Sequence, residues 1–134
     1  MYISKTDREF IKNKFGGLCA YSGTELSEDW QVDHVEPVRR NWYDSNVLNS
    51  HNHNLDNMFP TKKIINHYKH SMNLKQFREF MQDFHIRIAK LPKNPRTEKS
   101  VKRKAYMLEI ARLFDITPDK PFSGKFYFET LHNL

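Results

Sequence analysis

The sequence has a single cysteine and no long apolar run. Cys19 is the one Cys among 134 residues, which excludes an internal disulfide and a cysteine-rich zinc cage. No segment approaches the roughly 18 consecutive apolar residues of a membrane helix, and the first residues lack the apolar stretch of a secretion signal. We therefore expect a soluble, cytoplasmic protein with no membrane partner.

Apolar residues are also scarce. They make up 38% of the chain, below the usual range of about 45 to 50%. Aromatic residues nevertheless reach 13%, which is enough to build a core. A length of 134 residues suits one ordinary domain. We therefore expect a single domain over residues 1–134, with a polar surface.

The positive charge is unevenly distributed. Lys and Arg number 22 against 16 Asp and Glu, a net charge of +6. Residues 1–67 hold 8 basic and 9 acidic residues, whereas residues 68–134 hold 14 and 7. The densest basic stretch runs from Lys90 to Lys104. Clustered Lys and Arg indicate a polyanionic partner, because they displace counterions from a phosphate backbone; a solvated basic face that keeps the protein soluble is the alternative.

Periodicity and turn residues predict an α+β order in the first half. Thr6 and Glu9 resemble a capping box at the start of a helix over residues 6–15. Residues 18–23 and 30–35 resemble short strands. The Asn-, Asp- and Ser-rich residues 41–57 predict a long loop, and such loops in small domains are often functional.

The second half is predicted to be mainly helical. A short strand at residues 58–60 precedes a helix from Thr61 to Met72. Leu74, Phe77, Met81, Phe84 and Ile88 recur at helical spacing and predict a second helix over residues 74–91. A last helix starts at Thr97 or Ser100 and buries Met107, Ile110, Ala111 and Phe114 on one face. Residues 121–131 are expected to form a strand or an extended arm.

Two short stretches carry a spaced motif. The first is Asp33-His34-Val35-Glu36-Pro37. The second begins at Asn57, with Asn66 nine residues later and Lys69 three residues beyond that. In this order and spacing, the residues resemble the HNH endonuclease family, over about residues 18–70.

The resemblance implies a ββα-metal core, a two-stranded hairpin packed on a helix with one divalent cation between them. The core would span about residues 18–72, after an N-terminal helix, and a helical basic extension would follow over residues 73–134. In this family pattern Asp33 and Asn66 are metal ligands and His34 is the general base. Asn57 braces the loop with its side chain, and Lys69 faces the phosphate.

These residue types suit phosphodiester hydrolysis. A neutral imidazole can accept a proton from water near pH 7, and such help is worth about 100- to 10,000-fold in rate. A cation held by Asp33 and Asn66 would act as Lewis acid and template. Oxygen ligands completed by water and phosphate suit Mg²⁺ or Mn²⁺ better than zinc. His67 and His70 are the alternatives to Asn66 as second ligand, because His70 lies one helical turn beyond it.

The zinc-binding pairs of many relatives are missing. The positions that correspond to two Cys-x-x-Cys pairs are occupied by Cys19, Ser22, Lys62 and Ile65. We therefore expect no structural zinc and a buried Cys19. Stability must then come from packing, for which the candidates are Leu18, Tyr21, Trp30, Ile64, Ile65 and Tyr68.

The resulting hypothesis is a metal-dependent endonuclease that acts on DNA, most simply double-stranded DNA. A bacterial or phage source would suit such a compact nuclease. Basic residues near the motif and in the extension are its candidate DNA contacts: Arg39, Arg40, Lys62, Lys63, Lys99, Lys102, Arg103 and Lys104. Trp42 and Tyr43 could stack on a base, although burial is the simpler role for Trp42. The alternative function is a catalytically silent DNA-binding module of the same fold.

Overall fold

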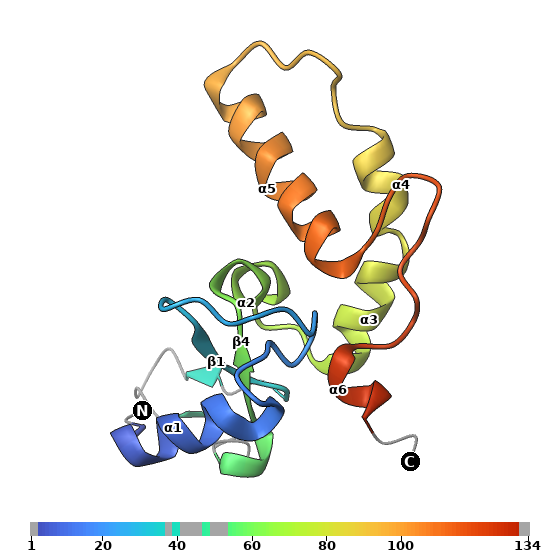
Figure 1. The fold of residues 1–134 in the computed structure, drawn as a ribbon. Helices are drawn as coiled ribbons and strands as arrows, with labels where there is room; N and C mark the ends of the chain where they lie inside the picture. The colour runs from blue at the N-terminus through green and yellow to red at the C-terminus, as the bar shows by residue number, and fades with distance from the viewer. Residues whose placement is uncertain (1–2, 37–38, 41–46, 49–53, 132–134) are drawn as a thin grey trace. The chain divides into compact units, whose positions relative to one another are not determined.

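The protein is a mixed α+β structure with helices and small antiparallel strand pairs (Figure 1). The computed structural model describes residues 3–36, 39–40, 47–48 and 54–131. It divides into two compact units, residues 1–77 with 126–134, and residues 78–125. The boundary therefore falls a few residues after the expected one, and the C-terminal tail belongs to the first unit. No helix in the described ranges has the length and apolar composition needed to cross a bilayer.

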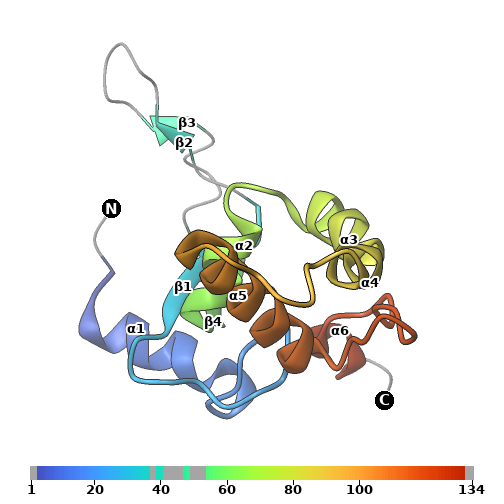
Figure 2. The ribbon, with the colours of Figure 1, turned by 90° about the horizontal axis from the view of Figure 1, so that it is seen from above.

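An antiparallel pair of strands forms the centre of the first unit. Strand β1 (Gln31–His34) pairs with β4 (Met58–Thr61), and Asp33 lies opposite Phe59. Helix α2 (Lys63–Lys69) follows β4 after one residue and lies against β1 (Figure 2). Both strands were predicted, but Thr61 ends β4 and does not cap α2, whose N-cap is Lys62.

The described part of the connection between β1 and β4 contains three short elements. Strands β2 (Arg39–Arg40) and β3 (Val47–Leu48) pair with each other, and the 3-10 helix η3 (Leu55–Asn57) leads into β4. The side chains of Arg39 and Arg40 lie outside the described part of the structure, as do Trp42 and Tyr43. Their predicted contacts with DNA therefore remain predictions.

The N-terminal helix begins earlier than its sequence signal indicated. Helix α1 spans Lys5–Lys12 and continues as the 3-10 helix η1 (Asn13–Phe15). Its N-cap is Ser4, whose hydroxyl accepts a hydrogen bond from the Asp7 amide at 3.0 Å. The predicted capping box at Thr6 is therefore wrong, because Ser4 supplies the same cap two residues upstream.

The predicted strand at residues 18–23 is instead a tight turn. Leu18 forms one isolated bridge with Glu25, and the Gly23 amide donates to the Cys19 carbonyl at 2.9 Å. Gly23 has a φ of 71°, and a Cβ atom there would lie 2.6 Å from the Tyr127 ring. Only glycine fits both conditions. The turn buries Cys19 completely, as predicted.

Two apolar clusters hold this unit together. One consists of Ile11, Trp30 and Met58, between α1 and the strands. The other surrounds the ring of Tyr21, which makes edge contacts with Phe77 and Phe126 at centroid distances of 5.5 and 5.2 Å. Tyr21, Trp30 and Ile65 are buried as predicted, whereas Leu18, Ile64 and Tyr68 are only partly buried.

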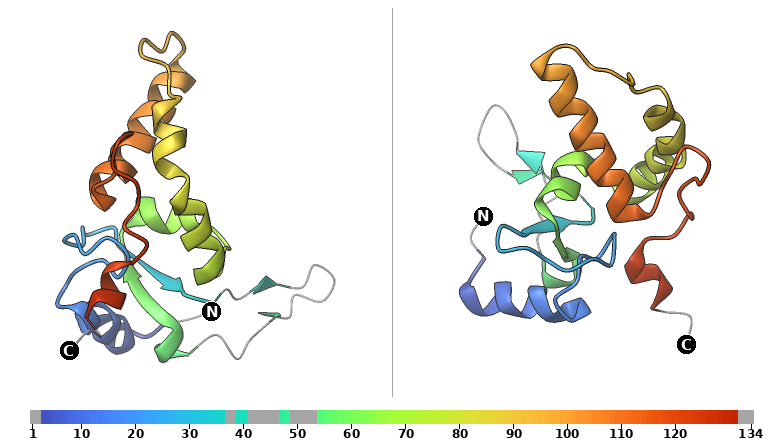
Figure 3. Two further views of the ribbon diagram at one scale, coloured as in Figure 1. Left: turned by 90° about the vertical axis from the view of Figure 1, so that its right-hand side faces the viewer. Right: turned by 45° about the horizontal axis from the view of Figure 1, so that its top comes forward.

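The predicted helix over residues 74–91 is broken into two. Helix α3 spans Leu74–Gln82 and α4 spans Phe84–Ala89, with Asp83 between them. Most of the predicted apolar stripe is confirmed, since Phe77, Met81, Phe84 and Ile88 are buried, whereas Leu74 is only partly buried. Helix α5 (Glu98–Phe114) is capped by Thr97, and it runs opposite to α4, which it contacts (Figures 1 and 3).

The tail forms a short helix, α6 (Tyr127–Thr130), and not a strand. The amides of Tyr127 and Phe128 donate to the carbonyl oxygens of Tyr21 and Ala20 at 3.0 and 2.9 Å. These bonds satisfy the first amides of α6, which have no partner within the helix. The tail is thereby attached to the turn that precedes β1.

Candidate active site

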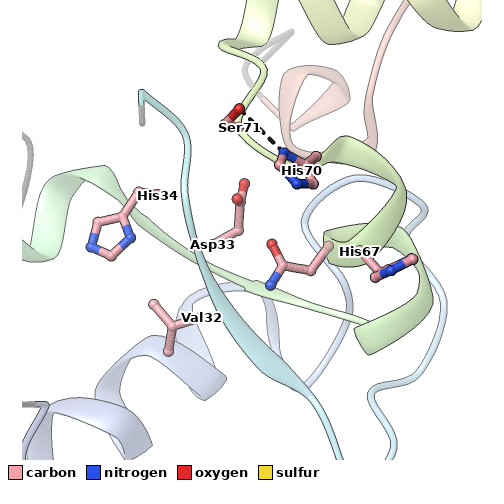
Figure 4. Close-up of a pocket in the computed structure, with 7 residues that line it drawn as sticks. Val32, Asp33, His34, His67, His70 and Ser71 are labelled. Carbon is pink, nitrogen blue, oxygen red and sulfur yellow. Dashed lines mark hydrogen bonds between the residues drawn. The ribbon is translucent and has the colours of Figure 1, made fainter. Parts of the chain in front are cut away.

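The two motif residues of β1 point to opposite sides of the strand. Figure 4 shows Asp33 and His34 on either side of the backbone, as the alternation of side chains along a strand requires. Asp33 is 4% exposed, whereas His34 is partly exposed. The strand therefore presents a buried carboxylate on one side and an accessible imidazole on the other.

Two side-chain contacts join helix α2 to strand β1. The Asn66 side-chain amide donates to Gln31 Oε1 at 2.7 Å. One turn later, the Lys69 ammonium contacts both carboxylate oxygens of Asp33 at 3.3 Å. Residues three apart share a helix face and residues two apart share a strand face. The two pairs therefore fix the register of α2 on β1.

Lys69 occupies an interior position. Its side chain is fully buried, and its ammonium also donates to the carbonyl oxygens of His34 at 3.2 Å and Val35 at 3.4 Å. An ammonium held in this way does not reach solvent. From the motif we expected Lys69 to face a phosphate. In the structure its charge is instead surrounded by the Asp33 carboxylate and the carbonyl oxygens of His34 and Val35.

Burial and hydrogen bonding act in opposite directions on Asp33. Burial raises the pKa of its carboxyl group, while the charge of Lys69 and the hydroxyl of Tyr21 oppose that shift. Tyr21 donates its hydroxyl hydrogen to Asp33 Oδ2. Burial, together with the negative charge of Asp33, raises the pKa of Tyr21 well above its ordinary value. The Tyr21 hydroxyl therefore stays protonated and remains a donor near neutral pH.

Asn57 holds the segment that follows β1. Its side-chain oxygen accepts from the Glu36 amide at 2.9 Å, and its side-chain nitrogen donates to the Glu36 carbonyl at 2.8 Å. Its own carbonyl accepts from the Val35 amide at 3.0 Å. The side chain thus mimics a strand partner just beyond His34, the kind of bracing that the motif implies for this residue.

This bracing predicts a specific effect of Asn57→Asp. The substitution keeps the acceptor for the Glu36 amide but places an oxygen opposite the Glu36 carbonyl. We expect a loss of about 1 to 2 kcal/mol in the free energy of unfolding, measured in urea. Asn73→Asp adds the same charge at a residue whose side chain accepts from Gln76, so it should change stability by less than about 0.5 kcal/mol. Equal effects of the two substitutions would contradict the bracing role.

A pocket of about 320 Å³ brings the predicted residues together. Asp33, His34 and Asn66 all line it, although they are 32 to 33 residues apart between strand and helix. The remaining lining residues are Val32, His67, His70 and Ser71.

No family model, curated protein or solved structure matches this chain. The assignment of a function therefore rests on the chemistry of this pocket.

His70 lies in an unusual backbone conformation at the edge of the pocket. Its φ is 54° and its ψ is −130°, where it ends helix α2. A side chain in such a region costs about 1 to 3 kcal/mol, and glycine tolerates it. Its Nδ1 lies 3.2 Å from the Ser71 hydroxyl oxygen (Figure 4).

We expect His70→Gly to raise the free energy of unfolding by about 1 kcal/mol, because strain relief exceeds the added entropy of the unfolded chain. His67→Gly, inside α2, should lower it by about the same amount. Denaturant unfolding of both variants tests this, and a destabilised His70→Gly would contradict it. If Asn66 is the second metal ligand, His70→Gly should also retain DNA cleavage.

The donors in the pocket fit a hard divalent cation. The Asn66 amide nitrogen is committed to Gln31, and within the described residues its oxygen has no donor. Asp33 has about four lone-pair sites, which Tyr21 and Lys69 share. No group of three His, Cys, Asp or Glu suited to a metal occurs in the described ranges. Mg²⁺ or Mn²⁺ would therefore rely on water and substrate for most of its ligands.

The predicted DNA contacts whose side chains the structure describes fall into two sets. Lys62 donates to the Glu25 carbonyl at 3.2 Å and Lys63 is exposed, both in the first unit. Lys99, Lys102 and Arg103 are exposed in the second unit, where Lys102 pairs with Glu98 at 2.9 Å. Lys104 donates to the Lys93 carbonyl at 3.0 Å.

Two residues of the site carried no motif signal. Tyr21 donates to Asp33, and Gln31 positions Asn66. Gln31 could have been found from the sequence, because it lies two residues before Asp33 and so shares its face of β1. Tyr21 could not, since the turn that carries it resembles a strand in sequence.

Proposed function

We propose that this protein is a metal-dependent HNH-type endonuclease that hydrolyses DNA phosphodiester bonds. One observation carries the proposal: Asp33 and Asn66 line a single pocket, and His34, whose ring lies on the other side of β1 from Asp33, contributes to the same lining. The order of β1, β4 and α2 is compatible with a ββα-metal core. The bonds from Asn57 to Glu36 support the same interpretation.

In this proposal His34 is the general base. Its imidazole accepts a proton from a water molecule, whose oxygen attacks the phosphorus while the bond to the 3′ oxygen breaks. Asp33 and Asn66 would hold the divalent cation, which offsets phosphate charge and stabilises the leaving oxygen when bound. Asn57 and Lys69 fix the backbone at His34 and in the two residues after it, through the carbonyl oxygens of His34, Val35 and Glu36.

The placement of Lys69 favours a second candidate function, a DNA-binding module without catalysis. The Lys69 ammonium is within 3.3 Å of both Asp33 oxygens and already balances their charge. If this pair excludes a divalent cation, the pocket loses its metal and only nucleic-acid binding remains.

A plasmid relaxation assay separates the two functions. Purified protein is incubated with supercoiled DNA in Mg²⁺, in Mn²⁺ or in EDTA, beside the His34→Ala variant. The endonuclease predicts nicked or linear DNA with either metal, and none with EDTA or with His34→Ala. Intact plasmid under all conditions, together with DNA binding, would establish the silent module instead.

A further inference from the structure

The second unit contains a pocket of its own, far along the chain from the motif residues. It encloses about 290 Å³ where α4 ends and α5 begins. Three of its lining residues are cationic, Arg87, Lys90 and Arg103. Leu91, Pro92 and Ser100 complete the lining, and none of these six described residues is acidic.

We infer that this pocket binds a phosphate group of a nucleic-acid backbone. Residues 78–125 hold 12 Lys and Arg against 6 Asp and Glu. This unit therefore carries a net charge of +6, equal to that of the whole chain. Three of these cationic residues, Arg87, Lys90 and Arg103, line this one cavity. The choice of ligand rests on the proposed function, whereas the preference for an anion rests on the lining itself.

Arg87 is held in place before any ligand arrives. Its Nη2 donates to the Phe80 carbonyl at 2.6 Å, and its guanidinium carbon lies 4.0 Å from the centre of the Phe80 ring. A guanidinium presents its N–H donors in a fixed fork that matches the geometry of a phosphate. A positioned Arg loses less side-chain entropy on binding than a mobile one.

Ser100 has a hydroxyl hydrogen to donate. Its oxygen accepts a hydrogen bond from the Thr97 hydroxyl at 2.8 Å, and Thr97 in turn accepts from the Ser100 amide at 3.0 Å. The hydrogen of Ser100 is not used in either bond. Arg103 lies one helical turn from Ser100 on the same side of α5. A phosphate in the pocket would therefore meet a neutral donor beside the cations.

The charges of Lys90 and Arg103 take no part in the described ion pairs of the second unit. Both side chains are exposed, and within the described residues neither forms an ion pair. By contrast, Arg112 pairs with Glu109 and Lys120 pairs with Asp115. Arg112 and Lys120 belong to the same unit as Lys90 and Arg103 and carry the same total charge. They therefore serve as a matched control.

The test compares Lys90→Gln/Arg103→Gln with Arg112→Gln/Lys120→Gln in the full chain. Affinity for a short DNA duplex is measured in EDTA over a range of salt concentrations. We expect the pocket variant to bind at least about 10-fold more weakly and to lower the salt slope by about 1, as for one lost phosphate contact. The control variant should lose less than about 3-fold with an unchanged slope. Equal losses in the two variants would overturn the inference.

Two further measurements identify the ligand. Inorganic phosphate, titrated at constant ionic strength into isotope-labelled protein, should shift the amide signals of Ser100 and Arg103. Ser100→Ala, which changes no charge, should weaken DNA binding by about 3-fold. If phosphate shifts these signals while both double variants bind DNA equally, the pocket serves a small phosphorylated molecule, and the nucleic-acid assignment is wrong.

The result can be read separately from the proposed function. Binding is measured in EDTA, so it does not require cleavage. If the pocket variant binds DNA more weakly but the protein never cuts DNA, phosphate binding in this pocket is supported and the proposed endonuclease activity is wrong. Normal cleavage together with equal binding losses would support the enzyme and remove the pocket.

Discussion

His34→Ala should lower the rate of DNA cleavage by about 100- to 10,000-fold, the usual contribution of a general base. The side chain is partly exposed at the end of β1, on the opposite side of the strand from Asp33 (Figure 4). Its removal should therefore change neither folding nor DNA affinity. Single-turnover cleavage with excess protein gives the rate, and fluorescence anisotropy in EDTA gives the affinity.

His67→Ala is the matched control for this prediction. His67 is exposed and lines the same pocket, but it lies on α2 outside the β1 motif. If Asn66 is the second metal ligand, we expect His67→Ala to retain cleavage within about 3-fold of the unaltered protein. A wild-type rate for His34→Ala would remove His34 from the mechanism, and equal losses in both variants would assign the effect to the pocket as a whole.

Lys69→Met should be the most destabilising single substitution in the site. Lys69 is fully buried and pairs with Asp33, which is itself 4% exposed. Removing one partner of a buried ion pair leaves the other charge uncompensated, at a cost of about 3 to 5 kcal/mol. Urea unfolding at pH 7 in EDTA measures the loss. Lys63→Met, on the exposed side of α2, should change the free energy of unfolding by less than about 0.5 kcal/mol.

The size of this loss should depend on pH. The folded-state pKa of Asp33 is raised above its ordinary value of 3.8, so the folded protein binds the proton more tightly than the unfolded chain does. This contribution to stability is complete below pH 3.8 and disappears as the pH rises through the folded-state pKa. Without Lys69 the pKa of Asp33 rises further. The deficit of Lys69→Met should therefore be largest at neutral pH and shrink in acid.

A second substitution should restore stability to Lys69→Met. Asp33→Asn removes the buried charge that Lys69 would otherwise balance, while it keeps an acceptor for the Tyr21 hydroxyl. We expect the double variant to regain most of the loss at neutral pH. A single variant that loses less than 1 kcal/mol would show that Asp33 is not ionised beside Lys69.

The sequence predicted those parts of the site that depend on local spacing. Strand-like composition identified β1, and helical spacing identified most of the buried face of α3, α4 and α5, because both signals lie within one element; Leu74 and Phe114 are only partly buried. The sequence did not predict that Lys69 is buried. That outcome depends on the register between α2 and β1, which pairs Asn66 with Gln31 and Lys69 with Asp33.

The errors have a similar origin. Residues 18–23 have the composition of a strand but form a turn, because the Ala20 amide bonds to the Pro60 carbonyl of β4 while Cys19 pairs with Thr24. The apolar stripe over residues 74–91 is continuous, yet the helix is interrupted at Asp83. Periodicity records which side chains are buried and does not record a break between two helices that share one buried face.

The most direct test of the proposed active site is the position of its divalent cation. Isotope-labelled His34→Ala protein, which should bind DNA without cutting it, is titrated with substoichiometric Mn²⁺ in the presence of a DNA duplex. Paramagnetic broadening should appear first at the side-chain amide of Asn66 and the backbone amide of Asp33. Broadening that avoids Asp33 and Asn66, or none at all, would contradict a metal-dependent nuclease centre in this pocket.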